Sequence, residues 1–492
     1  MKYFHVTKFK FVIYIAIFLL YITVAYQSFG YDDEFYNIEL VERLGLKAFL
    51  YTQTDDVHPP LSILINSILF KFFGSWQIVR IFSAFLISIS IIYYCESIEN
   101  KVQKIFFTIL IATSPSLLLW CTSIRWYSYF IPVLFWLVIL PKKLNWKYWC
   151  KFTIGSLLLA YIGYISFIVI PVIFLIYWLG DKNDLRLKIK YSFFSFVIFI
   201  ILYSPQIYYF LKFHYINRQD QFGSLFSNIA GVFISEFSNQ GIFPLSLAGL
   251  LSILGTFLIV LFTILISNKE TIKVHNKFYS FIVINLLLIF AGIASKFRNL
   301  IVVEPFKFSW LVSLDYQNKF KNLFFTGLTL IIFANILGSW NIITHKDTTK
   351  NSWNLPYTEL SMLLKSDSAM NKNQILIFVH DPTLTYLLRE NGYIVISPYF
   401  RTLNKKYIDT SRIVYFIKTF QGSINDSIYK NLMSDFKKLK FAGADTFYLG
   451  KDKNYKFKVK LDKRYPEYSI EIIKYKEVEN LSMLTEWKKI SK

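Results

Sequence analysis

Three adjacent carboxylates follow a lipid-length apolar run in the stretch FKFVIYIAIFLLYITVAYQSFGYDDEFY, residues Phe9–Tyr36. About 20 apolar residues suffice for a helix to cross the hydrocarbon core of a bilayer, and the run Phe9–Ser28 has that length. Carboxylates are costly beside hydrocarbon and usually mark function there. The cluster Asp32, Asp33 and Glu34 is therefore predicted to perform chemistry at a membrane surface.

The first apolar run has two readings. A cleavable signal peptide would also carry basic residues before its apolar core, and Lys2, Lys8 and Lys10 precede this one. However, the run is longer than the apolar core of a signal peptide. The sequence therefore favours a retained first helix.

The composition predicts a polytopic membrane protein. Of 492 residues, 54% are hydrophobic and 19% aromatic, which exceeds the usage of soluble domains. The formal net charge of +22 could indicate a nucleic-acid partner. Because the basic residues lie in short connectors between apolar runs, membrane lipid and topology explain them instead. No nucleic-acid partner is predicted.

Ten further apolar runs alternate with basic connectors such as 142–151 and 182–190. With about eleven transmembrane helices and a cytoplasmic N-terminus, every basic connector lies in the cytoplasm, as the positive-inside rule requires. The acidic segment 30–57, the loop 212–242 and everything after Trp340 then face outward. The ten runs lie at about 77–96, 103–121, 124–140, 151–165, 167–180, 190–211, 243–267, 278–295, 298–315 and 321–340.

Two outer segments have specific interpretations. Residues 59–74 are apolar but short, and Asn66 and Lys71 interrupt them. We expect an interfacial helix there, so that residues 30–76 form one outer catalytic loop. The loop 212–242 could cover a cavity as an acceptor-binding lid, although the ordinary polarity of a surface loop explains it equally well.

The chain changes character at about His345, where hydropathy falls and charged residues become frequent. We therefore expect a polytopic all-α membrane domain over residues 1–344 and a soluble extracytoplasmic α/β domain over 345–492. Alternating apolar and polar residues indicate strands, and longer amphipathic runs indicate helices. The predicted strands are 374–379, 393–397, 412–418, 446–449, 455–461 and 468–475, and the predicted helices are 382–391 and 426–440.

A carboxylate at the outer surface suits one reaction in particular. An aspartate can act as general base, removing a proton from an acceptor hydroxyl as its oxygen attacks C1 of a sugar. If the donor sugar is carried on a lipid phosphate, cations must hold that phosphate. His58, Arg125 and Arg298 stand at predicted outer membrane edges. For the acids, a solvated loop face is the competing interpretation.

Several short motifs, in order over residues 9–340, resemble the membrane-embedded GT-C glycosyltransferases. More narrowly, they are similar to the family of protein O-mannosyltransferases and the aminoarabinose transferase of lipid A (glycosyltransferase family 39-like). Asp56-Val57-His58-Pro59-Pro60-Leu61 is the most specific of them. The others are Asp33-Glu34-Phe35-Tyr36, Arg125-Trp126-Tyr127, Tyr203-Ser204-Pro205, and Arg298-Asn299-Leu300 followed by Pro305.

The resemblance implies a polyprenyl-phosphate-linked sugar donor, a lipid, glycan or protein acceptor, and an inverting displacement. Asp33 matches the family's catalytic aspartate and Glu34 its neighbour, while the additional Asp32 leaves the register of the base open by one residue. The implied substrate-binding residues are Asp56, His58, Arg125, Tyr127 and Arg298.

Metal dependence is less well supported. Many relatives in the family that the motifs resemble carry a second acid two residues before the fourth-span arginine, and here that position is Ser123. Asp56 and His58 could share a divalent cation, but two ligands make no dedicated metal site. No required metal is therefore predicted.

Three functions compete on the sequence alone. A glycosyltransferase of the bacterial inner membrane accounts for unusual residues that gather at one surface. A transporter or flippase of lipid-linked sugars would more often show internal repeats and broken helices at mid-membrane. A membrane scaffold would leave the acids and arginines without a purpose. The sequence favours the enzyme.

Overall fold

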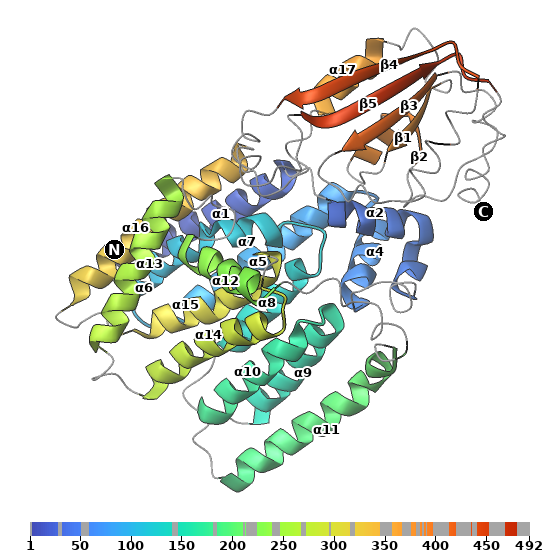
Figure 1. Ribbon diagram of the computed structural model, residues 1–492. Helices are drawn as coiled ribbons and strands as arrows, with labels where there is room; N and C mark the ends of the chain where they lie inside the picture. The colour runs from blue at the N-terminus through green and yellow to red at the C-terminus, as the bar shows by residue number, and fades with distance from the viewer. Residues whose placement is uncertain are drawn as a thin grey trace. The chain divides into compact units, whose positions relative to one another are not determined.

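The computed structural model is mostly helical with one small sheet (Figure 1). It describes residues 2–27, 32–50, 59–139, 146–180, 185–209, 212, 224–238, 247–266, 272–294, 297–314, 320–344, 357–366, 375–379, 384–385, 388–389, 391–396, 413–419, 434, 440–451 and 468–479.

The chain divides into two compact units. Unit 1 comprises Met1–Ser28 and Leu40–Thr349, and unit 2 comprises Phe29–Glu39 and Lys350–Lys492. The dividing line crosses helix α2 (Asp32–Leu44). The acidic cluster therefore groups with unit 2, whereas the last residues of its helix group with unit 1.

The described secondary structure of unit 1 is helical, as its long apolar runs require. Two 3-10 segments accompany the α-helices, η1 (Gly45–Lys47) and η5 (Phe297–Val303). The helices are α1 (Lys2–Gln27), α4 (Leu61–Phe73), α5 (Trp76–Glu96), α6 (Lys101–Ala112), α7 (Pro115–Cys121), α8 (Tyr127–Val138), α9 (Trp146–Ile162), α10 (Ser166–Gly180), α11 (Leu185–Tyr209), α12 (Leu225–Ser238), α13 (Leu247–Ile266), α14 (Ile272–Phe290), α15 (Glu304–Ser313) and α16 (Lys321–Ile343).

Three of these helices are long and apolar enough to cross a membrane on their own, namely α5, α13 and α16. Helices α6 and α7 make a fourth candidate if they count as one span bent by 51°. Shorter apolar helical stretches of 10–17 residues also occur in the described part of the chain, including Phe11–Tyr26 within α1, and α4 and α8.

Unit 1 differs from the sequence prediction at several places. The predicted span 103–121 is broken into α6 and α7, and the predicted span 298–315 is divided into η5 and α15. The predicted loop 212–242 contains the helix α12, which packs against α13, α14 and η5. Its packing against these neighbours stabilises a helix in a segment that was interpreted as a loop, and the Asn228 side chain is fully buried.

The break between α6 and α7 has a clear chemical cause. Pro115 has no amide hydrogen to continue the helix, and the Ser114 amide donates to Ile111 instead of Leu110 (3.2 Å). Helix α16 supplies the missing donors. Asn335 Nδ2 donates to the carbonyl of Leu110 (3.0 Å) and Ser339 Oγ to that of Thr113 (2.8 Å), so the freed carbonyls are satisfied away from water.

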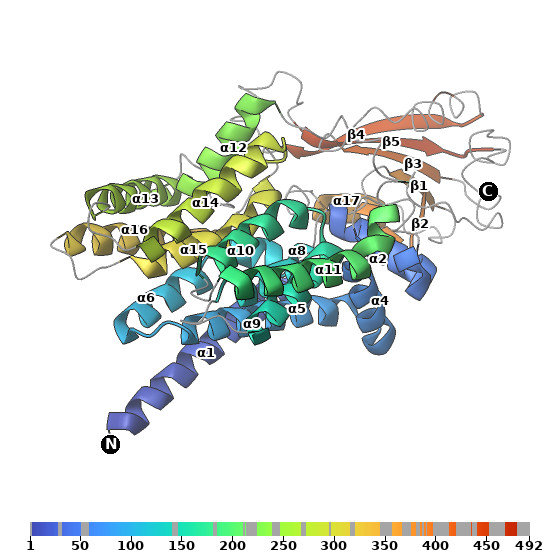
Figure 2. The same ribbon diagram turned by 90° about the horizontal axis from the view of Figure 1, so that it is seen from below.

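Unit 2 contains a five-stranded sheet in the order β2-β1-β3-β5-β4 (Figure 2). Strands β1, β2 and β3 are parallel, while β5 pairs antiparallel with β3 and with β4. Helix α17 contributes Leu360 and Leu364 to the core on one sheet face. The elements are α17 (Tyr357–Ser366), β1 (Ile375–Val379), β2 (Ile394–Ile396), β3 (Ile413–Thr419), β4 (Gly443–Lys451) and β5 (Tyr468–Lys476).

Five of the six strands predicted for this region coincide with an observed strand. The predicted strand 455–461 and nearly all of the predicted helix 426–440 lie outside the described residues. Helix α17, which is ten residues long, was not predicted, because a short helix that follows a polar stretch is hard to distinguish from a loop.

Candidate functional site

Buried polar side chains gather where α4, α5 and α8 pack together in unit 1. Tyr129 on α8 donates its hydroxyl hydrogen to Oδ1 of Asn66 on α4 (2.5 Å). Ser83 on α5 lies beside Tyr129, and its hydroxyl donates to the carbonyl of Val79 (3.3 Å). All three side chains are buried. Polar groups at such depth are costly unless paired, so this network fixes the mutual position of three helices.

Two buried arginines lie beside this network. Arg80 precedes Ser83 by one turn of α5, and only 6% of it is exposed. Arg125 lies in the turn before α8, where its carbonyl accepts from the Ser128 amide (3.1 Å), and it is 5% exposed. Because α5 and α8 pack together and Ser83 meets Tyr129, both arginines belong to the same end of this helix pair.

A pair of buried guanidinium groups suits an anionic ligand. The Nε atoms of both side chains have no hydrogen-bond partner among the described residues, although each residue makes other interactions. Arginine presents a rigid fork of donors that matches phosphate oxygens. Ionisable residues inside a membrane bundle are functional candidates by default. Arg80 and Arg125 can therefore hold a phosphate group.

Tyr127 adds a hydroxyl to the same region. The residue is fully buried, and its hydroxyl has no hydrogen-bond partner among the described residues. Its ring lies 5.7 Å from that of Trp120 and 5.0 Å from that of Trp126, measured between centroids. A buried hydroxyl without a partner costs about 1–3 kcal/mol, and an oxygen of a bound substrate would remove that cost.

Ser123 occupies the position two residues before Arg125, where a second acid was considered. Its hydroxyl donates to the carbonyl of Trp120 (2.6 Å), and its own carbonyl accepts from the hydroxyl of Ser128. The residue is fully buried. Ser123 therefore closes the turn between α7 and α8, a role that a carboxylate, which has no hydrogen to donate when ionised, would not fill.

Arg298 lies in η5, a segment that packs against both α7 and α8. The backbone of Arg298 therefore belongs to a segment that contacts the two helices on either side of Arg125. The side chain of Arg298 is outside what the structure describes. Asp56 and His58 lie outside the described residues. Pro59 and Pro60, which follow them, are buried just before α4.

The acidic cluster forms the first turn of α2 rather than a loop. Asp32, Asp33 and Glu34 begin the helix, where the positive end of the helix dipole favours carboxylates. Glu34 is fully buried. The side chains of Asp32 and Asp33 are outside what the structure describes, so the assignment of the base remains a prediction.

The sequence analysis did not identify Arg80 as a site residue, and it did not identify Asn66 as part of a buried network. Arg80 lies inside the run 77–96, which reads as an ordinary span because a single charge hardly alters the mean hydropathy. The cost of one arginine within an apolar run was the available signal. Asn66 was interpreted only as a polar residue that interrupts the apolar segment 59–74. A buried amide, however, needs hydrogen-bond partners.

No group of three or more His, Cys, Asp or Glu side chains that could hold a metal ion occurs within the described ranges. Asp56 and His58, the pair that could share a divalent cation, lie outside those ranges. Histidine and carboxylate oxygen can both ligate divalent metals. The structure therefore does not test that pair.

Two crystal structures share this fold. ArnT from Cupriavidus metallidurans in the apo state has a TM-score of 0.56 and 10% identity, over 95% of this chain and 98% of that one. ArnT from the same organism bound to undecaprenyl phosphate has a TM-score of 0.52 and 9% identity, over 96% and 98%. No protein-family model and no curated protein matches the sequence. The predicted GT-C fold is confirmed, and the chain has the fold of ArnT over nearly its whole length.

Proposed function

We propose that the chain is an integral membrane glycosyltransferase that uses a polyprenyl-phosphate-linked sugar donor. The observation that carries the proposal is the pair of buried arginines, Arg80 and Arg125, at one end of α5 and α8. The fold supports it, because one of the ArnT structures is bound to undecaprenyl phosphate. The acceptor is a lipid, a glycan or a protein.

In the proposed reaction, Asp33 accepts the proton of the acceptor hydroxyl as its oxygen bonds to C1 of the sugar. The bond from C1 to the phosphate oxygen breaks with inversion, and the polyprenyl phosphate leaves with the electron pair. Arg80 and Arg125 hold the negative charge that develops on the phosphate. Tyr127, His58, Asp56 and Arg298 complete the set of substrate contacts.

We also propose that the chain lies in a bacterial inner membrane with about eleven transmembrane helices. The basic connectors then face the cytoplasm. The N-terminus is cytoplasmic, and the domain 345–492 is extracytoplasmic. The membrane-embedded domain is 1–344, with residues 30–76 at the outer face.

A transfer assay with purified protein tests the enzyme proposal. The donor is an undecaprenyl-phosphate sugar, and donor binding is measured separately by tryptophan fluorescence. Asp33→Asn is expected to abolish transfer while retaining donor binding. The matched control is Asp445→Asn, which removes only an exposed ion pair with Lys476.

Each outcome of the assay has one meaning. Loss in Asp32→Asn with full activity in Asp33→Asn moves the base by one residue. Full transfer activity in both variants would contradict the proposed mechanism. The sugar and acceptor follow from mass spectrometry of lipid-linked and surface glycans in cells with and without the gene, because the missing residue identifies both.

A flippase of lipid-linked sugars is the second candidate. The bend of 51° between α6 and α7 favours it, since broken helices are common in transporters. A flippase moves its substrate across the bilayer and forms no glycosidic bond. Lipid movement in proteoliposomes without sugar transfer would establish this alternative.

A further inference from the structure

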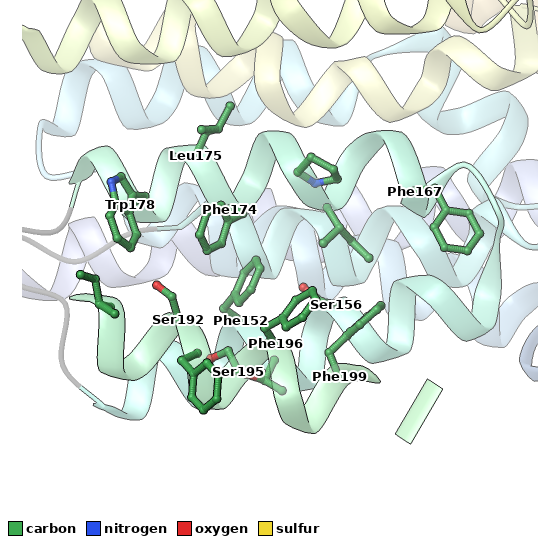
Figure 3. A pocket seen from close by; sticks show the side chains of 15 residues that line it. Phe152, Ser156, Phe167, Phe174, Leu175, Trp178, Ser192, Ser195, Phe196 and Phe199 are labelled. Carbon is green, nitrogen blue, oxygen red and sulfur yellow. The ribbon is translucent and has the colours of Figure 1, made fainter. Parts of the chain in front are cut away.

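A cavity of about 730 Å³ lies between α9, α10 and α11, away from the arginine pair (Figure 3). Its size falls within the range of about 300–1,000 Å³ that is usual for ligand pockets. Helix α9 packs against both α10 and α11. The walls are mainly aromatic and aliphatic, and Phe152, Phe174, Trp178 and Phe196 are among them. Such walls suit hydrocarbon.

Four hydroxyl side chains interrupt this apolar wall, and two of them differ from the others. Ser156 on α9 and Ser195 on α11 line the cavity and are 1% and 3% exposed. Neither hydroxyl has a hydrogen-bond partner among the described residues. By contrast, Thr153 and Ser192 in the same wall donate to carbonyls of their own helices, at 2.9 and 2.7 Å. Two donors in the cavity wall are therefore available to an acceptor on a ligand.

One end of the cavity is basic. Trp178 and Ile189 form part of that end, and Lys188 on α11 donates to the carbonyl of Trp178 on α10 (3.3 Å). Arg186 and Lys190 flank Lys188 at the start of α11. Cations at a helix N-terminus add to the positive end of the helix dipole. An anion at this position would offset both charges.

The cavity also has an opening toward the outside of the bundle. Phe193 and Phe196 on α11 line the cavity, yet 62% and 64% of these residues are exposed. In a bilayer these exposed rings face lipid. A ligand can therefore enter from the membrane without passing through the protein.

We propose that this cavity binds an anionic glycerophospholipid. An acyl chain lies among the phenylalanines, an ester carbonyl accepts from Ser156 or Ser195, and the phosphate lies at the Lys188 end. Ester carbonyls lie between the phosphate and the hydrocarbon of such a lipid. A polyprenyl chain has no acceptor along its hydrocarbon, so the two serines favour a phospholipid over the proposed sugar donor.

Native mass spectrometry of the full chain in detergent tests the proposal. Delipidated protein is mixed with phosphatidylglycerol, phosphatidylcholine or undecaprenyl phosphate, and the bound lipid is counted. Wild-type protein is expected to retain one phosphatidylglycerol in preference to phosphatidylcholine. Ser195→Phe, which fills the cavity, is expected to lose it. Lys188→Gln is expected to reduce the preference about fivefold, the effect of one basic residue on an anionic lipid.

Matched controls separate the cavity from the rest of the surface. Ile201→Phe adds bulk to the exposed side of the same helix, and Lys101→Gln removes an exposed cation at the start of α6; both should retain the lipid as wild-type does. If Ser195→Phe does not fold, the double variant Ser156→Ala with Ser195→Ala keeps the cavity and should weaken retention about tenfold.

Three results would overturn the proposal. One is equal retention of phosphatidylglycerol by wild type and by the folded cavity variants. The second is equal retention of phosphatidylcholine and phosphatidylglycerol by wild type. The third is displacement of the phospholipid by undecaprenyl phosphate at equal concentration, which would assign the cavity to the polyprenyl chain.

Discussion

Gly255 on α13 and Gly327 on α16 meet backbone to backbone. A methyl group at Gly255 would lie 2.7 Å from the carbonyl oxygen of Gly327, and one at Gly327 would lie 2.8 Å from the carbonyl oxygen of Gly255. Real Cβ atoms do not come so close to backbone oxygen. Small residues permit such close packing of membrane helices, where van der Waals contact replaces the hydrophobic effect. The two helices therefore depend on glycine at both positions.

Gly327→Val is expected to destabilise the membrane unit. The added side chain must push α13 and α16 apart, and overpacking of this kind costs about 1–3 kcal/mol. A lower midpoint of thermal unfolding in detergent, followed by tryptophan fluorescence, would show it. Thr329→Val on the exposed side of α16 is the control and should unfold as wild type does. Equal midpoints for both variants would contradict the packing argument.

Asn335→Leu is expected to loosen the join between α6 and α7. Its side-chain amide is the donor to the Leu110 carbonyl, and a buried acceptor that loses its donor costs about 1–3 kcal/mol. The same unfolding measurement applies, with Asn322→Leu at the exposed start of α16 as its control. If unfolding is unchanged, another donor must reach the Leu110 carbonyl.

Arg80→Gln is expected to weaken transfer through donor binding. Hydrogen bonds to a charged group contribute about 1.5–3 kcal/mol, so the KM for an undecaprenyl-phosphate sugar should rise about 10–150-fold. Arg125→Gln should raise the KM as well, and the KM of the double variant should rise less than the product of the two single effects, because both side chains contact one phosphate in the proposed site. Steady-state kinetics measure all three.

The exposed Lys321→Gln serves as the control for loss of a positive charge. Unchanged KM in Arg80→Gln, together with normal folding, would remove Arg80 from the donor site. A fall in kcat alone would place its effect on the chemical step instead.

A reporter fused after Thr344 is expected to read as extracytoplasmic. That result follows from eleven spans with a cytoplasmic N-terminus. A second fusion after Gly180 should read as cytoplasmic. A cytoplasmic reading after Thr344 would mean that α4 crosses the membrane, and it would reverse every later connector.

Hydropathy located most helices of unit 1 within a few residues. The predicted spans 77–96 and 321–340 correspond to α5 and α16. A long apolar run inside a membrane must satisfy its own backbone hydrogen bonds, so it forms a helix whichever elements it packs against. Hydropathy did not predict the break after Thr113. Pro115 is the local sign of it in the sequence, and the donors that satisfy the freed carbonyls lie on α16, more than 200 residues further on.

Two of the predicted site residues, Arg125 and Tyr127, are buried beside one network, and their roles in substrate binding stay predictions. Arg80 was not predicted as a site residue, since the sequence of α5 does not reveal which face of that helix packs against α8. The side chain of Asp33 is outside what the structure describes, so its role rests on the sequence alone.

The hydrogen bonds between α16 and the break have a consequence for biosynthesis. The carbonyls of Leu110 and Thr113 are made 225 and 226 residues before their donors, Asn335 and Ser339. Until α16 is inserted, those carbonyls lie without these partners in a medium that offers none. A ribosome-bound chain that stops before α16 is therefore an incomplete assembly.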